Sequence, residues 1–232
     1  MATREERFGV ILDVIAHVTG TADPNVLDLG CGPGSLAGRV LDHFPGGRVV
    51  AVDTDPVLQL LGRKAYGDSD GRLTWVLADL GSGWSDAITS AGPYDAVVST
   101  TALHWLQPDS LVRCLTQAGE VLRAGGVFVN GDHQVEPGQP RIAELQRSLR
   151  RIPANRRHEY RPWYEALQAI DDPEMAAAVQ AHEERGAGHP HDENSAMLGF
   201  HEAALRQAGF SEVGCVWQQG DDRVLVGLRP AG

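Results

Sequence analysis

The chain has 232 residues, of which 42% are hydrophobic and 22% are charged, which is typical of a globular protein with one large domain. Its formal net charge of −11 argues against general nucleic-acid binding, because phosphate contacts need a positive surface. The chain lacks an apolar run of membrane-span length, a signal-peptide pattern and metal-type cysteine spacing, so we expect a cytoplasmic protein with reduced thiols and no membrane partner.

Strands and helices alternate along the first 133 residues. Helical spacing of apolar residues predicts helices over 7–18, 35–44, 55–67 and 108–122. Continuous apolar runs predict strands over 25–30, 48–53, 72–79, 94–100 and 127–132. Such strands, separated by helices, are typical of a parallel sheet covered on both faces, and right-handed crossovers make that sheet doubly wound.

The pattern changes after residue 133. Residues 137–192 are polar and rich in Pro and Arg, with helices expected over 140–152 and 161–185. A helix over 195–210 follows, and then two strands, 212–219 and 221–229, which a tight turn joins into an antiparallel hairpin. The sequence therefore predicts a single α/β domain over 1–232. Its Rossmann-like sheet has seven strands, mostly parallel with an antiparallel C-terminal hairpin strand, and a helical cap insertion occupies 137–192.

Polar and glycine residues gather where the predicted parallel strands end. Gly30, Asp53, Asp79, Ser99 and Asp132 all occupy such positions. Ligands of doubly wound sheets bind beyond the carboxyl ends of the strands. We therefore expect one rim of the sheet to hold the functional site.

The stretch "VLDLGCGPGS", residues 26–35, carries glycines at 30, 32 and 34 and an acid two residues before the first of them. A glycine turn after the first strand, with Asp53 some twenty residues later, outlines a dinucleotide-binding site. That signature needs a third glycine at position 35, where this chain has Ser35. A nicotinamide-dependent oxidoreductase therefore remains the disfavoured alternative.

These residues resemble the class I S-adenosylmethionine-dependent methyltransferases. "VLDLGCGPG" is close to the first motif of that family and "AVDTDP" resembles its second, while "LADL", "YDAVVSTTALHWL" and "VLRAGGVFVNGD" look like later segments in the expected order. "ALHWL" followed by "RAGGVF" is most similar to the trans-aconitate methyltransferase-like branch, which acts on small molecules. The insertion at 137–192 lies where such enzymes carry a variable substrate cap.

The resemblance implies S-adenosyl-L-methionine as the cofactor. In that reading Asp28 organises the loop or meets the cofactor's ammonium group through water, and Asp53, at an exposed strand end, holds the ribose. Asp79 meets the adenine amino group, or else only caps a turn. The implied cofactor-binding residues are Asp28, Gly30, Cys31, Gly32, Gly34, Asp53, Thr54, Asp79, Leu80, Ser99 and Thr100. A protein that binds the cofactor without turnover is a second alternative.

The implied acceptor is a small molecule, and an arginine-rich stretch of the insertion points to an acidic one. The arginines are Arg141, Arg147, Arg150, Arg151, Arg156, Arg157 and Arg161. One or two of them turned inward would clamp a carboxylate, with Trp163 and Tyr164 as an apolar wall. The alternative is a solvated helical face.

Histidines near the rim are candidates for the base that takes the acceptor's proton. We rank His133 first because a strand end fixes it, then His104, then His191; Trp105 is expected to pack its helix onto the sheet. A metal bound by His133, His189, His191 and Asp192 is a further reading. We expect no metal, since these residues lack helical ligand spacing and a thiolate cluster.

Overall fold

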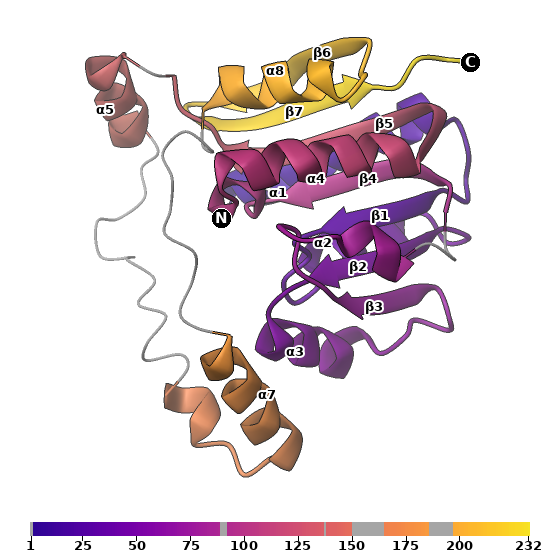
Figure 1. Ribbon diagram of the computed structural model, residues 1–232, viewed down its shortest axis with the longest axis vertical. Helices are drawn as coiled ribbons and strands as arrows, with labels where there is room; N and C mark the ends of the chain where they lie inside the picture. Colours follow the sequence, from indigo (N-terminus) through magenta and orange to yellow (C-terminus); the bar gives the residue numbers. More distant parts are fainter. Residues whose placement is uncertain (1, 89–91, 137, 150–164, 186–196) are drawn as a thin grey trace.

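A computed structural model describes residues 2–88, 92–136, 138–149, 165–185 and 197–232. One sheet of seven strands runs through it in the order β3-β2-β1-β4-β5-β7-β6 (Figure 1). The strands are β1 (Asn25–Leu29), β2 (Arg48–Asp53), β3 (Leu73–Leu77), β4 (Tyr94–Thr100), β5 (Leu122–His133), β6 (Glu212–Gln219) and β7 (Asp222–Leu228). β1 to β5 pair in parallel, and β7 is antiparallel to both β5 and β6. The predicted doubly wound α/β fold is confirmed.

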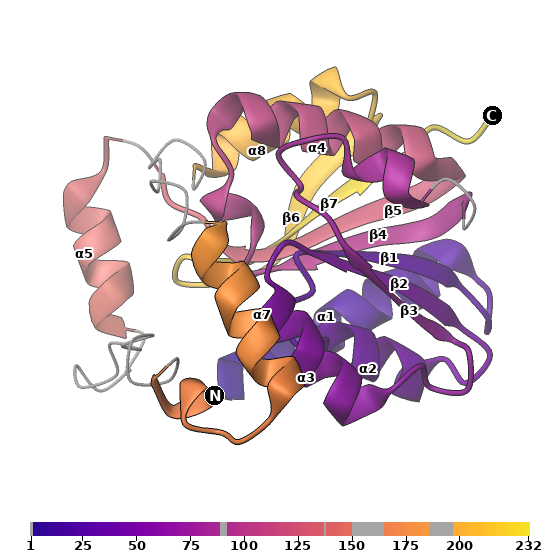
Figure 2. The same cartoon turned by 60° about the horizontal axis from the view of Figure 1, so that its bottom comes forward.

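Helices cover both faces of this sheet (Figure 2). α1 (Ala2–Thr19), α2 (Ser35–His43) and α3 (Pro56–Tyr66) lie on one face, and α4 (Pro108–Val121) and α8 (Leu198–Gln207) lie on the other. Each face buries its own apolar cluster, one around Phe8, Ile11 and Val98, the other around Leu115, Phe128 and Leu205. None of the helices in the described ranges is long and apolar enough to cross a membrane.

The strand order reverses beside β1, because β2 pairs with one of its edges and β4 with the other. The segments that follow β1 and β4 therefore diverge beyond the carboxyl ends of these two strands. Doubly wound sheets bind ligands at this place. Two short 3-10 turns, η1 (Trp84–Ile88) and η2 (Leu103–Trp105), follow β3 and β4. The fold thus places the glycine loop and the η2 turn at one rim.

The first turn of α3 is capped by the residue before it. Asp55 accepts hydrogen bonds from the backbone N–H groups of Val57 and Leu58, and Pro56 occupies the first helical position. The cap satisfies two of the N–H groups that a helix start leaves without a partner. It also fixes the chain direction immediately after Asp53.

The insertion contributes α5 (Pro140–Leu149) and α7 (Pro173–Glu184). α7 packs on α3, where Met175 and Val179 meet Val57 and Leu60 (Figures 1 and 2). α5 projects away from the body of the sheet and contacts the β6–β7 turn, where Gln146 donates a hydrogen bond of 3.4 Å to the Gly220 carbonyl. The helical stretch expected over 161–185 is interrupted within its described part, residues 165–185. Residues 165–168 are helical and α7 starts afresh at Pro173, because proline cannot donate the next helical hydrogen bond and Asp172 caps the new helix.

Candidate functional site

The glycine loop turns back on the sheet with all three glycines in the left-handed region, at φ 71, 52 and 77° for Gly30, Gly32 and Gly34. A side chain at Gly30 would collide with Ala102, which enters the η2 turn. Glycine is needed there for both the backbone conformation and the close approach. The segment that follows β1 therefore contacts the segment that follows β4 at Gly30 and Ala102, before the two segments diverge.

The N–H groups of the loop already have partners. Those of Gly30 and Cys31 both donate to the Val52 carbonyl, at 2.8 and 3.0 Å, and that of Gly34 donates to the Cys31 carbonyl at 2.9 Å. The N–H of Gly32 donates to Asp53 Oδ2 at 2.7 Å. Position 33 is a proline and has no N–H to offer. The loop therefore presents few backbone donors to an anion.

Asp53 ends β2 and is only 9% exposed, so the expectation of an exposed strand end is wrong. The loop folds over it, and its two oxygens accept the N–H groups of Gly32 and Asp55 at 2.7 and 2.8 Å. Burial raises the pKa of Asp53, and these backbone N–H groups oppose the rise. Asp53 thus holds the loop to the strand as well as facing the rim.

Asp28 lies in β1 with no exposed surface, and neither of its carboxylate oxygens has a well-formed hydrogen bond in the described part of the chain. Burial raises its pKa to about 7, and the nearby charge of Asp53 adds to the rise, while a weak interaction with the backbone N–H of Ala37 opposes it only in part. An unpaired buried carboxylate is costly unless a cation approaches it. The pair Asp28 and Asp53 therefore favours a positively charged ligand group.

Other predicted cofactor residues support the loop in different ways. Ser99 is fully buried and donates its hydroxyl to the Leu29 carbonyl at 2.7 Å, so it fixes the end of β1. Leu80 is 8% exposed, and its side chain lies next to the position a side chain on Gly30 would take. Cys31 is buried, which raises the pKa of its thiol well above the ordinary value. A reactive role for this thiol is disfavoured.

Asp79 and Thr54 lie at the outer part of the rim. Asp79 accepts the backbone N–H of Gly81 at 2.8 Å and the Ser82 hydroxyl at 3.3 Å, so it caps a turn, as the alternative reading expects. The Thr54 carbonyl accepts a hydrogen bond of 2.7 Å from Arg185, the residue that ends α7. Sequence reasoning missed Arg185, since a single arginine at the end of a polar segment gives no signal. This contact docks the described end of the insertion beside Asp53.

The candidate bases are placed differently. His104 in η2 lies 2.9 and 3.0 Å from the two oxygens of Asp132 through its Nδ1, while His133 Nδ1 lies 3.7 Å from Asp221. Thr100, the last residue of β4, places its hydroxyl 3.3 Å from that of Thr101. His191 lies outside the described residues, as do His189, Asp192, Trp163, Tyr164, Arg150, Arg151, Arg156, Arg157 and Arg161.

Two further expectations concern exposed residues. Trp105 is 45% exposed, so the expectation that it packs onto the sheet is wrong; the 3-10 turn directs its ring outward. Arg141 is an exposed residue of α5, and Arg147 belongs to the same helix. Within the described ranges, no three His, Cys, Asp or Glu side chains gather as a metal site.

A buried ion pair that sequence reasoning missed closes the rim from the other side. Arg7 of α1, 3% exposed, donates to Asp222 at 2.7 Å and to the Thr101 hydroxyl at 2.9 Å. Arg7 and Asp222 are 215 positions apart, so no local pattern reveals the pair. Thr101 has a φ of 55°, which is an outlier for a β-branched residue and indicates strain at this point of the rim.

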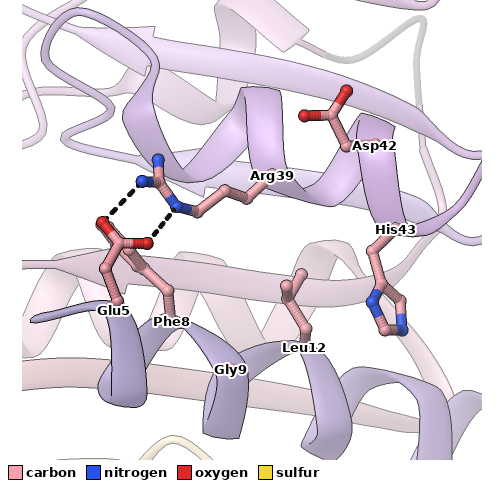
Figure 3. A pocket seen from close by; sticks show the side chains of 7 residues that line it. All are labelled: Glu5, Phe8, Gly9, Leu12, Arg39, Asp42 and His43. Carbon is pink, nitrogen blue, oxygen red and sulfur yellow. Dashed lines mark hydrogen bonds and ion pairs between the residues drawn. The ribbon is translucent and has the colours of Figure 1, made fainter. Parts of the chain in front are cut away.

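A surface groove of about 390 Å³ lies between α1 and α2 (Figure 3). Arg39 crosses it to Glu5, with hydrogen bonds of 2.6 and 3.1 Å, and Phe8, Leu12 and His43 line its sides. No predicted site residue contributes to this groove. The candidate site is therefore the rim around the glycine loop.

Residues 26–126 match the family described as "Methyltransferase domain". The match covers the glycine loop, Asp28, Asp53 and the η2 turn. This stretch is therefore similar to a methyltransferase domain, in agreement with the resemblance to the class I S-adenosylmethionine-dependent methyltransferases. Relatives in sequence include two proteins named trans-aconitate 2-methyltransferase. The one from Azoarcus sp. (strain BH72) is 32% identical over 53% of this chain and 45% of that protein, and the one from Methylobacterium radiotolerans is 29% identical over 75% and 58%. The match therefore spans about half the length of these relatives.

Solved structures have the same methyltransferase fold. An O-methyltransferase family protein from Burkholderia thailandensis has a TM-score of 0.60 at 19% identity, covering 97% of this chain and 56% of that one. Human N-acetylserotonin methyltransferase in complex with SAM has a TM-score of 0.54 at 13% identity, covering 97% and 55%. At these identities the likeness concerns the fold alone.

Proposed function

We infer that this chain transfers a methyl group from S-adenosyl-L-methionine to a small-molecule acceptor. The observation that carries the proposal is the charge of the loop: its N–H groups are taken up by Val52, Cys31 and Asp53, while the carboxylates of Asp28 and Asp53 remain. A cofactor with a sulfonium and an ammonium group suits these acids. The pyrophosphate of a dinucleotide would instead need the missing donors.

The chain has the residues that such a cofactor requires. Gly30 lets the loop pack closely on Ala102, Asp53 has carboxylate lone pairs to offer ribose hydroxyls, and Asp28 is buried without a well-formed hydrogen bond. Asp79, Leu80, Thr54 and Thr100, at the ends of neighbouring strands, are the other residues proposed to meet the cofactor. When bound, the cofactor supplies an electrophilic methyl group on a positively charged sulfur.

The acceptor is proposed to be a small molecule that carries an acidic group. The relatives that support this are named for trans-aconitate, a small acid. Arg141 on α5 belongs to the arginine-rich stretch that would recognise a carboxylate. α7 docks against α3 beside Asp53, so the insertion borders the site as a substrate cap would.

The test is calorimetric titration of the full chain with S-adenosylmethionine, S-adenosylhomocysteine and NAD, followed by detection of S-adenosylhomocysteine formed with candidate acceptors. We expect binding of the first two ligands, no binding of NAD, and turnover. Binding of NAD alone would favour the oxidoreductase. Binding of S-adenosylmethionine without product from any acceptor would favour the silent binding protein.

A further inference from the structure

His104 and Asp132 form a hydrogen-bonded pair at the rim, next to the glycine loop. Nδ1 of His104 is 2.9 and 3.0 Å from the two oxygens of Asp132. The Asp132 side chain is 1% exposed, whereas that of His104 is 15% exposed. The carboxylate is thus buried behind the imidazole, and the imidazole reaches the surface of the site.

Asp132 is held in its charged form. Burial alone raises the pKa of this carboxyl group, but the hydrogen bond and charge of His104, the backbone N–H of His133 at 2.8 Å and the charge of His201 together lower the pKa below its ordinary value. His201 reaches it from α8 and is fully buried. Arg223, opposite Asp132 in the β5–β7 register, is paired with Glu136 at 2.9 Å. An ionised carboxylate on Nδ1 stabilises a proton arriving at the other ring nitrogen, Nε2.

The backbone places this imidazole beside the cofactor loop. Ala102, two residues before His104, is the residue against which Gly30 packs. Thr101 before it is held in the left-handed region by a backbone hydrogen bond to Gly131, at 2.9 Å, and by Arg7 on its hydroxyl. Several long-range contacts therefore maintain a strained turn whose effect is to position His104.

His133 is the weaker candidate on this geometry. Consecutive residues of a strand point to opposite faces of the sheet, so His133 points away from the face that carries Asp132 and His104. Its Nδ1 lies 3.7 Å from Asp221 on the β6–β7 turn.

Trp105 follows His104 directly, and the centroids of the two rings are 5.1 Å apart. The Trp105 side chain is 45% exposed and presents apolar surface beside His104.

We propose that His104 is the general base of this enzyme, positioned by Asp132, and that the methylated atom is a phenolic or enolic hydroxyl oxygen. The inference rests on the proposed function and narrows its acceptor. A carboxylate nucleophile is already ionised near pH 7 and needs no base. A carboxylate on the same acceptor therefore serves recognition, and the proton-bearing hydroxyl is the group that reacts.

The proposed methyl transfer conserves atoms and charge. His104 Nε2 takes the hydroxyl proton as the oxygen forms its bond to the methyl carbon. The electron pair of the breaking carbon–sulfur bond stays on sulfur, whose positive charge disappears. The imidazolium then releases its proton to solvent, and Asp132 stays ionised throughout.

The experiment follows S-adenosylhomocysteine formation by the full chain with substituted phenols and 1,3-dicarbonyl enols of graded pKa, and with trans-aconitate as the carboxylate arm. We expect hydroxyl methylation to fall at acid pH, where a general base is protonated and cannot take the hydroxyl proton. His104→Gln should lower kcat by roughly 10²–10⁴-fold and leave the Kd of S-adenosylmethionine unchanged. The defect should shrink as the acceptor's pKa falls below the assay pH, because an ionised acceptor needs no base.

Asp132→Asn tests the positioning residue. We expect lower kcat and an acid limb moved to lower pH, since the imidazolium loses its counter-charge; a purely structural role would leave the limb in place. His17→Gln, an exposed histidine of α1, is the matched control. Three results would overturn the inference. The first is a kcat defect in His104→Gln that is equally large for every acceptor pKa, and the second is loss of activity in His133→Gln but not in His104→Gln. The third is that no phenol or enol in the panel is methylated. If S-adenosylmethionine does not bind the wild-type chain, the proposed function itself fails.

Discussion

The two sides of the rim are built in different ways. On the β1–β2 side, the glycine loop and Asp53 are joined by contacts between neighbouring strands, and each of these residues follows a strand in a short sequence motif. On the β4–β5–β7 side, Arg7, Thr101 and Asp222 come from distant parts of the chain and meet only in the folded protein. The β1–β2 side, where we propose that the cofactor binds, is therefore encoded locally, and the β4–β5–β7 side, the proposed acceptor side, depends on tertiary structure.

The largest expected effect is on the acceptor side. Arg7→Met leaves the buried Asp222 carboxylate without its counter-charge and should lower the free energy of unfolding by about 3–5 kcal/mol. Denaturant unfolding measures this loss. Arg39→Met, which removes the partly exposed Glu5–Arg39 pair, should cost about 1 kcal/mol or less. Recovery of stability in the double variant Arg7→Met/Asp222→Leu would localise the loss to the unpaired charge, and no recovery would contradict this reading.

Gly30→Ala should break the cofactor side. The added methyl group meets Ala102 in a backbone conformation that alanine adopts with strain, so the loop must move. We expect at least a ~100-fold rise in the Kd of S-adenosylmethionine, measured by calorimetry, equivalent to about 3 kcal/mol. Gly20→Ala is the matched control, because Gly20 has a φ of 60° with open space around it. Equal losses of affinity in the two variants would show that strain, rather than the contact with Ala102, is responsible.

The difference between the two sides explains what the sequence could predict. The sheet, its hairpin and the glycine loop follow from apolar runs and from glycine spacing, which act within a few residues. The pairing of His104 with Asp132 depends on how η2 and the end of β5 meet, and Asp132 carries no signal that separates it from His133 next to it. The burial of Asp53 was missed for a related reason: the loop that covers it returns from another strand.

Asp53→Ala and Asp53→Asn sharpen the comparison by separating loop support from ligand binding. Alanine leaves the N–H groups of Gly32 and Asp55 without partners and should weaken cofactor binding by on the order of 1.5–3 kcal/mol, with a loss of stability as well. Asparagine keeps one acceptor oxygen and should retain more of the stability than of the affinity. Calorimetry and thermal unfolding measure the two effects, with the exposed Asp13→Asn as control. Unchanged affinity in both folded variants would remove Asp53 from the cofactor site.

Asp28→Asn should give a smaller change in stability than Arg7→Met, and the size of this change depends on pH. The folded pKa of about 7 lies above the ordinary value of 3.8, so the folded chain holds this proton more tightly than the unfolded chain does. The free energy of unfolding of the wild-type chain therefore falls as pH rises from about 4 to 7, and it does not fall further above pH 7. Asparagine removes this penalty, so its stabilising effect should be absent below pH 4, grow toward pH 7 and then level off.

The full rise in pKa corresponds to roughly 4 kcal/mol, but the buried amide also lacks hydrogen-bond partners, so we expect a gain on the order of 1–2 kcal/mol at pH 8. The same variant should bind S-adenosylmethionine about tenfold more weakly, because the negative charge that favours its ammonium group is gone. Urea unfolding across pH 4–8 and calorimetry at pH 8 measure the two effects. A variant that is less stable than the wild type at pH 8, or one that binds the cofactor equally well, would mean that Asp28 serves the fold rather than the ligand.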